Sequence, residues 1–199
     1  MRPNMKDATA IPVRNDSASS YGWRNKAARA LWGVAWILIF RPSWRRWHSL
    51  RRVILRAFGA QLSGTARVAG TATIWAPWNL VMEESAEIGP NVICYSVDEI
   101  RIGRHATVSQ NSHLCAGGRD VSDRLFRPTK APIVIEPYAW VGADAFVGPG
   151  VTIGEGAVLG ARGVAFKDLP AWTISLGNPA QVVGRRILND DGEAGSPRV

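Results

Sequence analysis

A period of six residues runs through this sequence from about Val68 to its C-terminal region. Its clearest copies are IEPYAW, VGADAF, VGPGVT, IGEGAV and LGARGV, which follow one another without a gap from Ile135. Each copy opens with an aliphatic residue and carries a small residue or valine four positions later. The pattern recurs upstream in copies that open at Met82, Ile88, Ile102, Val108 and Leu114. Five consecutive matches argue against chance alternation in an ordinary β protein and indicate a stacked repeat.

A triangular coil explains the period. Each copy supplies one flat face and one corner, so three copies, about 18 residues, complete a turn, and successive turns stack as parallel strands about 4.8 Å apart. The opening side chain points into the prism, the small residue fits at the turn, and glycine at the second place tolerates the backbone geometry of the corner. The sequence therefore predicts an all-β protein built as a parallel β-helix. The period itself leaves the hand of the coil open.

Changes in pattern divide the chain into segments. Residues 1–20 are polar and predict a mobile tail, and residues 21–59 predict a basic amphipathic helical segment. The β-helix domain should cover residues 60–187, followed by a C-terminal tail at 188–199. The period fails at RDVSDRLFRPTKAP, which predicts a loop extruded from the coil at residues 118–132.

The helical segment carries most of the positive charge. Residues 1–58 hold twelve Lys and Arg against two acids, whereas the whole chain has a net charge of +8. The apolar run Leu31–Phe40 is too short to span a bilayer, which needs ~20 residues, and no small-residue cleavage site follows it. A second helix should begin near Ser43 and stop at Gly59. Its alternating Trp and Arg residues suit an anionic membrane surface, so residues 24–58 can make peripheral membrane contact; packing against the body or a neighbouring subunit is equally compatible. The bulky apolar residues argue against nucleic acid.

Several motifs resemble those of one protein family. They are RALWGVAWILIFRPS, WAPWNL, VSQNSHLCAGGRD and LPAWTISLGNPAQVVGRR, together with the repeats. On these motifs the chain resembles bacterial hexapeptide-repeat acetyltransferases, and most closely the O-acetyltransferases of colanic acid and exopolysaccharide biosynthesis. The resemblance implies a left-handed coil, a cytoplasmic homotrimer with active sites between subunits, acetyl-CoA as acyl donor, and a saccharide acceptor that can be lipid-linked.

The resemblance also implies which residues form the site. Those expected along acetyl-CoA are Gly142, Ala143, Gly160, Ala161, Lys167, Gly177, Asn178, Pro179, Ala180 and Arg185, with Arg186 as an alternative to Arg185. Backbone N–H groups at such corners can reach the pantetheine amides, and cations balance the phosphate charge. Tyr95, in VICYSV, corresponds to the acceptor region.

The chain departs from the family at the catalytic base. A histidine directly before an aspartate is expected at the start of the extruded loop, but here Arg119 precedes Asp120. Arginine stays protonated and cannot accept a proton. We therefore keep Arg119 and Asp120 as the catalytic candidates, with Arg119 as an oxyanion stabiliser or His113 as another base. A catalytically degenerate protein that binds CoA or glycan, or a structural trimer, is the alternative.

Other chemistries fit the sequence poorly. A zinc enzyme on this fold would need three converging histidines, and the chain has only His48, His105 and His113, so no metal is expected. The two cysteines, Cys94 and Cys115, are too few for a disulfide scaffold and are read as free buried thiols. No nucleotide-binding domain precedes the repeat, which argues against a nucleotidyltransferase.

Overall fold

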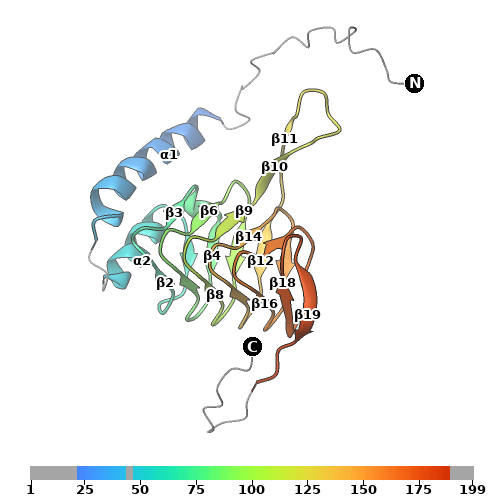
Figure 1. The fold of residues 1–199 in the computed structure, drawn as a ribbon. Coiled ribbons are helices and arrows are strands. Elements are labelled where there is room, and N and C mark those ends of the chain that lie inside the picture. Colours follow the sequence, from blue (N-terminus) through green and yellow to red (C-terminus); the bar gives the residue numbers. More distant parts are fainter. Residues whose placement is uncertain (1–21, 44–46, 189–199) are drawn as a thin grey trace.

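The computed structural model describes residues 22–43 and 47–188. Its body is a left-handed parallel β-helix whose three walls are parallel sheets, with two helices at one end and a hairpin on one side (Figure 1). The fold class expected from the repeat is confirmed. The expected tail at residues 1–20, Trp44, Arg45 and Arg46, and residues 189–199 lie outside the described residues.

The walls are called sheets A, B and C, in the order in which the first coil enters them. Sheet A contains β1 (Gln61–Leu62), β4 (Leu80–Met82), β7 (Ile100–Ile102), β12 (Ile133–Ile135) and β15 (Thr152–Ile153). Sheet B contains β2 (Arg67–Val68), β5 (Glu87–Ile88), β8 (Thr107–Val108), β13 (Trp140–Val141), β16 (Val158–Leu159), β18 (Thr173–Leu176) and β19 (Gln181–Arg185). Sheet C contains β3 (Thr73–Ile74), β6 (Ile93–Tyr95), β9 (His113–Cys115), β14 (Phe146–Val147) and β17 (Val164–Ala165). The last strand, β19, runs antiparallel to β18 and closes the C-terminal end.

The core is the column of opening side chains. Ile102, Leu114, Ile135 and Ile153 are completely buried, and the small residue four places on is buried in each regular copy. Full burial of such an aliphatic side chain contributes about 1.5–3 kcal/mol. The period of six is therefore the spacing at which the chain returns a side chain to the prism interior.

The corner geometry differs from the expectation in one respect. Backbone φ is positive at the fourth place of the copies, for example +57° at His105 and +57° at Asp144, whereas no second-place glycine has a positive φ. The expected role of the second-place glycine is therefore wrong. A Cβ atom on Gly142 would lie 2.6 Å from the backbone nitrogen of Ala161 in the next coil. The second place needs glycine because coils approach closely there.

Coil length also varies. Leu62 pairs with Met82 and Met82 with Ile102, so these coils take 20 residues instead of the expected 18. Ile135 pairs with Ile153, which gives the regular 18. The extra residues all fall between sheet C and sheet A.

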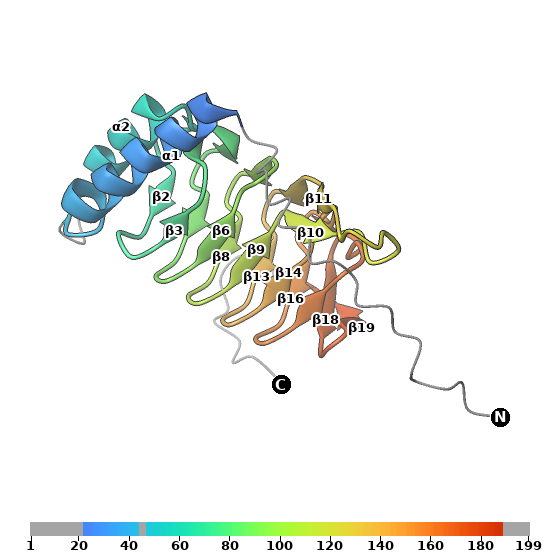
Figure 2. The same cartoon turned by 90° about the horizontal axis from the view of Figure 1, so that it is seen from above.

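Helices cover the N-terminal end of the prism (Figure 2). They are α1 (Trp23–Ala35), the π-helix η1 (Trp36–Phe40) and α2 (His48–Ala57), and a 3-10 turn, η2 (Pro77–Asn79), lies within the coil. The expected helix start near Ser43 is wrong, because Ser43 belongs to the turn after η1. Its N–H donates to the Phe40 carbonyl at 3.3 Å, and its carbonyl accepts a bond from Arg51. The expected stop is confirmed: α2 ends just before Gly59, whose φ is +91°. No described helix is long and apolar enough to cross a membrane.

The arginines of α2 cap the open end of the coil. Backbone N–H groups of each coil donate to carbonyls of the next, so the first coil has carbonyls without a preceding partner. Arg51 donates to the Val68 carbonyl at 3.0 Å, Arg52 to Ala66 at 3.1 Å and Arg56 to Leu62 at 2.6 Å. These bonds satisfy a sheet edge that would otherwise stay open. Three of the arginines that the sequence offers for membrane contact therefore bind the body of the protein.

The expected extruded segment forms an antiparallel hairpin, β10 (Gly117–Arg119) and β11 (Pro128–Lys130), which projects from the side of the coil (Figure 1).

Candidate active site

Enlarged corners gather on one edge of the prism. The segments that join sheet C to sheet A, here called the C–A corners, cover residues 75–79, 96–99 and 116–132 in three successive coils. The next one, at 148–151, has the regular length, since the buried residues that flank it, Val147 and Ile153, lie six apart, whereas Cys94 and Ile102 lie eight apart. Because a rigid coil stacks equivalent corners, the three longer corners form one wall, here called the C–A wall, and the hairpin belongs to the last of them.

The hairpin presents a cation and an anion. Arg119 is exposed and donates from Nη1 to the Phe126 carbonyl across the hairpin at 3.0 Å. Asp120 Oδ1 accepts bonds from the Ser122 hydroxyl at 2.8 Å and the Ser122 N–H at 2.9 Å. The Ser122 bonds, the hydroxyl's first, lower the pKa of the Asp120 carboxyl. Asp120 is thus a poor proton acceptor at neutral pH, and Arg119 has no lone pair to offer.

Tyr95 lies at the foot of the hairpin. Its ring meets the ring of Trp75 edge-on at a centroid distance of 5.0 Å. A Cβ atom on Gly117 would lie 2.6 Å from Val97 Cγ2 and 3.0 Å from Tyr95 Cε1, so only glycine fits there. The acceptor candidate Tyr95 and the hairpin base are therefore brought together.

The residues expected along acetyl-CoA form a second edge, where sheet B passes into sheet C. The corners at residues 142–145 and 160–163 stack directly, since Arg162 N–H donates to the Ala143 carbonyl at 2.8 Å. Gly142 and Gly160 use their N–H groups within the coil, on the carbonyls of Leu159 and Ser175. Within the described part of the chain, the N–H groups of Ala143 and Ala161 make no hydrogen bond. These two donors are available to an amide ligand.

Residues 177–180 continue this edge by one coil. Gly177 accepts from the Val164 N–H at 2.9 Å, and the Ala180 N–H donates to the Val164 carbonyl at 2.8 Å; Asn178 and Pro179 lie exposed between them. The three basic residues expected along acetyl-CoA do not lie on this edge. Lys167 follows β17 on the C–A side, and Arg185 pairs with Thr173 at the start of β18. Arg186 is bound to the coil itself, through the carbonyls of Tyr138 and Gly156.

A single chain does not bring the two edges together. The hairpin lies after the strands of sheet C, and the Gly142 and Gly160 corners lie before them. Donor and catalytic candidates thus occupy opposite sides of one wall.

His113 lies on the outer face of sheet C between these edges. Its ring meets Phe146 edge-on at 5.4 Å, its Nε2 is buried without a hydrogen-bond partner, and burial lowers its pKa. The lowered pKa favours the neutral form of the imidazole. Both cysteines are free, but only Cys94 is buried; Cys115 is half-buried, and its thiol donates to the Gly117 carbonyl at 3.2 Å. The expectation of two buried thiols is therefore wrong for Cys115, because its strand turns this side chain outward beside the hairpin.

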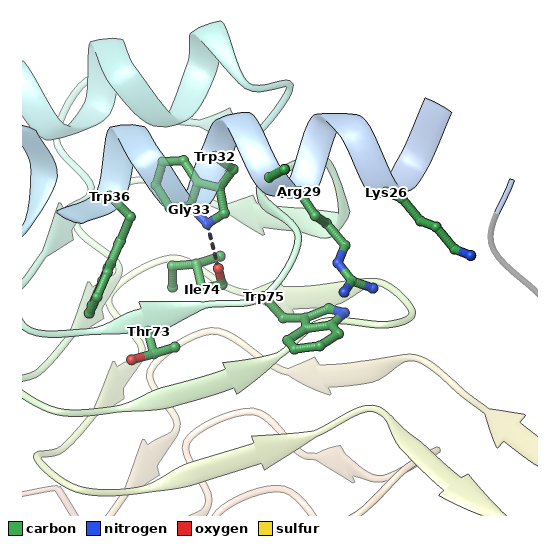
Figure 3. Close-up of a pocket in the computed structure, with 9 residues that line it drawn as sticks. Lys26, Arg29, Trp32, Gly33, Trp36, Thr73, Ile74 and Trp75 are labelled. Atoms are coloured by element: carbon green, nitrogen blue, oxygen red, sulfur yellow. Dashed lines mark hydrogen bonds between the residues drawn. The ribbon is translucent and has the colours of Figure 1, made fainter. Parts of the chain in front are cut away.

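The sequence alone assigns no role to Arg29 or Trp75, which stack on each other where α1 crosses sheet C (Figure 3). Both lie in family motifs, and WAPWNL breaks the period of six, which is the signal that could have identified Trp75. Nothing in the sequence pairs Trp75 with a helix 46 residues earlier. Among residues 22–43 and 47–188, no group of three or more His, Cys, Asp or Glu side chains could hold a metal ion.

Comparison with known proteins gives close relatives of one kind. Escherichia coli (strain K12) WcaF, named as an acetyltransferase of colanic acid biosynthesis, is 40% identical over 157 residues, which cover 79% of this chain and 86% of WcaF. Among solved structures, the maltose O-acetyltransferase of Clostridium difficile 630 has a TM-score of 0.74 at 24% identity, covering 84% of this chain and 90% of that one. The Vibrio cholerae acetyltransferase VCA0836, complexed with acetyl-CoA, has a TM-score of 0.73 at 22% identity, covering 85% and 91%. At these identities the two structures show the fold alone. No family model matches the chain.

Proposed function

The chain belongs to the hexapeptide-repeat acetyltransferases, in the branch of colanic acid biosynthesis, and on that premise we propose that it transfers an acetyl group from acetyl-CoA to a hydroxyl of a surface-glycan saccharide. The observation that carries the proposal is the identity of 40% with WcaF over 157 residues, 79% of this chain. The free N–H groups of Ala143 and Ala161 support it, because they stack on the edge where the family binds the donor.

The reaction needs positioning and charge stabilisation at the hairpin. The acceptor oxygen attacks the thioester carbonyl, a C–O bond forms, the C–S bond breaks, and the hydroxyl proton ends on the CoA thiol. Negative charge develops on the carbonyl oxygen during the attack, and a fixed cation lowers the barrier. We assign this role to Arg119, and Asp120 acts as a positioning residue that folds the hairpin turn around Ser122.

The active site is proposed to form between copies of a homotrimer. The separation of the donor edge from the hairpin supports this arrangement, since a site within one chain would leave acetyl-CoA on the wrong side of sheet C. In a closed ring each copy can supply its donor edge to the hairpin of its neighbour.

The proposed function is tested by measuring acetyl transfer from labelled acetyl-CoA to membrane glycolipid and oligosaccharide extracts. We expect acetyl esters on saccharide, formed by a species with three times the chain mass of 21.6 kDa in sedimentation. Label that stays on acetyl-CoA with every extract contradicts the enzymatic proposal. A monomer that transfers acetyl at full rate contradicts the shared site.

A non-catalytic glycan- or CoA-binding protein is the second candidate. The specific observation in its favour is Arg119, which occupies the place of the family's base and already bonds to the Phe126 carbonyl. Acetyl transfer by the variants Arg119→Ala and Arg119→His distinguishes this binding protein from the acetyltransferase.

The cytoplasmic face of a membrane is the proposed location. The exposed side of α1 and η1 carries large apolar residues, among them Trp23 at 76%, Leu38 at 68% and Leu31 at 66% exposure. Arg24, Lys26 and Arg41 are exposed on the same segment. An apolar stripe flanked by cations suits an anionic headgroup layer.

Replacing Leu31 and Leu38 together with serine should weaken binding to vesicles of phosphatidylglycerol and phosphatidylcholine at least about tenfold, because two buried side chains are lost from the lipid. Cosedimentation measures the effect. Ile187→Ser is the matched control, since Ile187 is 85% exposed but follows β19 at the other end of the coil. Equal binding of the double variant and this control contradicts the membrane surface.

A further inference from the structure

A pocket of about 370 Å³ lies between the helical segment of α1 and η1 and the coil at β3 and Trp75, and it combines aromatic side chains with two cations. Arg29 reaches over Trp75, Trp36 lies at the other end of the pocket, and Lys26 lines it from one turn earlier on α1 with its amine pointing away from Trp75 (Figure 3). No carboxylate lines it. Among the described residues, neither cation forms an ion pair or a hydrogen bond. Within residues 22–43 and 47–188, the positive charge of the pocket is therefore not neutralised.

Arg29 is held in place by stacking rather than by hydrogen bonds. Its guanidinium lies 4.1 Å from the centroid of the Trp75 ring. The indole of Trp32, one turn along the helix, donates to the Ile74 carbonyl at 2.6 Å and fixes α1 to the strand that precedes Trp75. Stacking orders the guanidinium and leaves its N–H groups free at the rim. A guanidinium held in this way can donate two parallel hydrogen bonds to two oxygens of one phosphate.

Side-chain contacts link the pocket to the candidate active site. Trp75 contacts Tyr95, and Tyr95 lies against Gly117, two residues before Arg119. A ligand whose anion bound Arg29 could extend along Tyr95 and present a hydroxyl at the hairpin.

From this geometry we propose that Lys26, Arg29 and Trp75 form the binding site for the phosphate or diphosphate group of a glycosyl phosphate acceptor. The inference rests on the proposed function and narrows its substrate class from saccharides in general to sugars carried on a phosphate. The carrier can be an isoprenoid lipid or a nucleoside. The exposed apolar residues Leu31 of α1 and Leu38 of η1 lie on the same helical segment as both cations, and they favour the lipid.

Calorimetric titration of the full chain, without acetyl-CoA, tests the site with three probes: farnesyl diphosphate, UDP-glucose and inorganic pyrophosphate. All three should bind, and Arg29→Gln should weaken each at least about tenfold, because a charge-assisted fork is lost. Arg29→Lys should fall between the two, since it keeps the charge without the fork. Arg104→Gln is the matched control, because Arg104 also lies over an aromatic ring, that of Tyr138, but outside the pocket, and it should bind within twofold of the natural chain. Tighter binding of farnesyl diphosphate identifies a lipid carrier, and tighter binding of UDP-glucose a nucleotide carrier.

Two results would overturn the site: pyrophosphate that does not bind, or binding of all probes by Arg29→Gln within twofold of the natural chain. Acetyl-CoA affinity should be the same in Arg29→Gln and the natural chain, so a general loss of folding is recognised. Failure here is separable from failure of the proposed function. Acetyl transfer to uncharged oligosaccharides without Arg29-dependent diphosphate binding would contradict only the proposed phosphate site. Diphosphate binding without any acetyl transfer would contradict only the proposed acetyltransferase activity.

Discussion

Replacing Arg119 with alanine should lower kcat/KM for acetyl transfer about 100- to 1000-fold, as expected for loss of one preorganised donor to the developing oxyanion. Thermal stability should stay unchanged, because the Arg119 side chain is exposed and makes a single bond, to the Phe126 carbonyl. The measurement compares single-turnover acetyl transfer by the natural chain and the variant. Arg124→Ala is the matched control: Arg124 is exposed in the same hairpin, and it should keep its rate.

The variant Arg119→His decides between the two candidate functions. Histidine restores a base, and general-base catalysis is worth about 10²–10⁴ in rate. If Arg119 is part of a working site, the histidine variant should transfer acetyl no more than tenfold faster than the natural chain, since it loses the cation as it gains the base. Transfer by Arg119→His alone would mean that the natural hairpin is disabled and that the protein binds its ligands without chemistry.

Replacing Gly103 with alanine should lower the free energy of unfolding by about 1–3 kcal/mol or more, the cost of forcing an extra carbon into a packed interior. The added Cβ would lie 2.6 Å from the backbone nitrogen of Pro137 and 2.8 Å from the carbonyl carbon of Glu136 in the next coil. Neither atom can move aside, because the Gly103 N–H donates to the Ile135 carbonyl at 2.7 Å. Gly103 has ordinary φ, so the effect comes from contact between coils alone.

Denaturant unfolding at a fixed protein concentration measures the effect, so that any association between copies contributes equally to the variants compared. Gly64→Ala is the control, since a Cβ atom there meets nothing within 4 Å. That substitution should be neutral or stabilise by about 0.4–1 kcal/mol through the unfolded chain. Equal stability of the two variants would contradict the requirement for close approach at the second place of the repeat.

The repeat alone predicts the coil and most of its core. Residues equivalent to the opener Ile135 and to the small residue Ala139 recur every six positions. Both are buried, because every copy repeats the same local geometry. The failure of the period after Gly118 likewise predicts an extruded segment, since its two aliphatic residues, Val121 and Leu125, do not recur at a spacing of six. The resemblance to the family adds the left hand of the coil. It also shows that Arg119 stands where the family has its catalytic histidine.

Contacts between distant parts of the chain were beyond such reasoning. The arginines of α2 looked like a membrane-facing set, yet Arg51, Arg52 and Arg56 bind carbonyls of the first coil, because a stack of parallel coils leaves one end without donors. The pairing of Arg29 with Trp75 depends on where α1 crosses sheet C, and no spacing in the sequence encodes that crossing. The period of six states which residues point inward. Which outward residues meet depends on the stacking of corners and the docking of helices, and these are set by packing over the whole molecule.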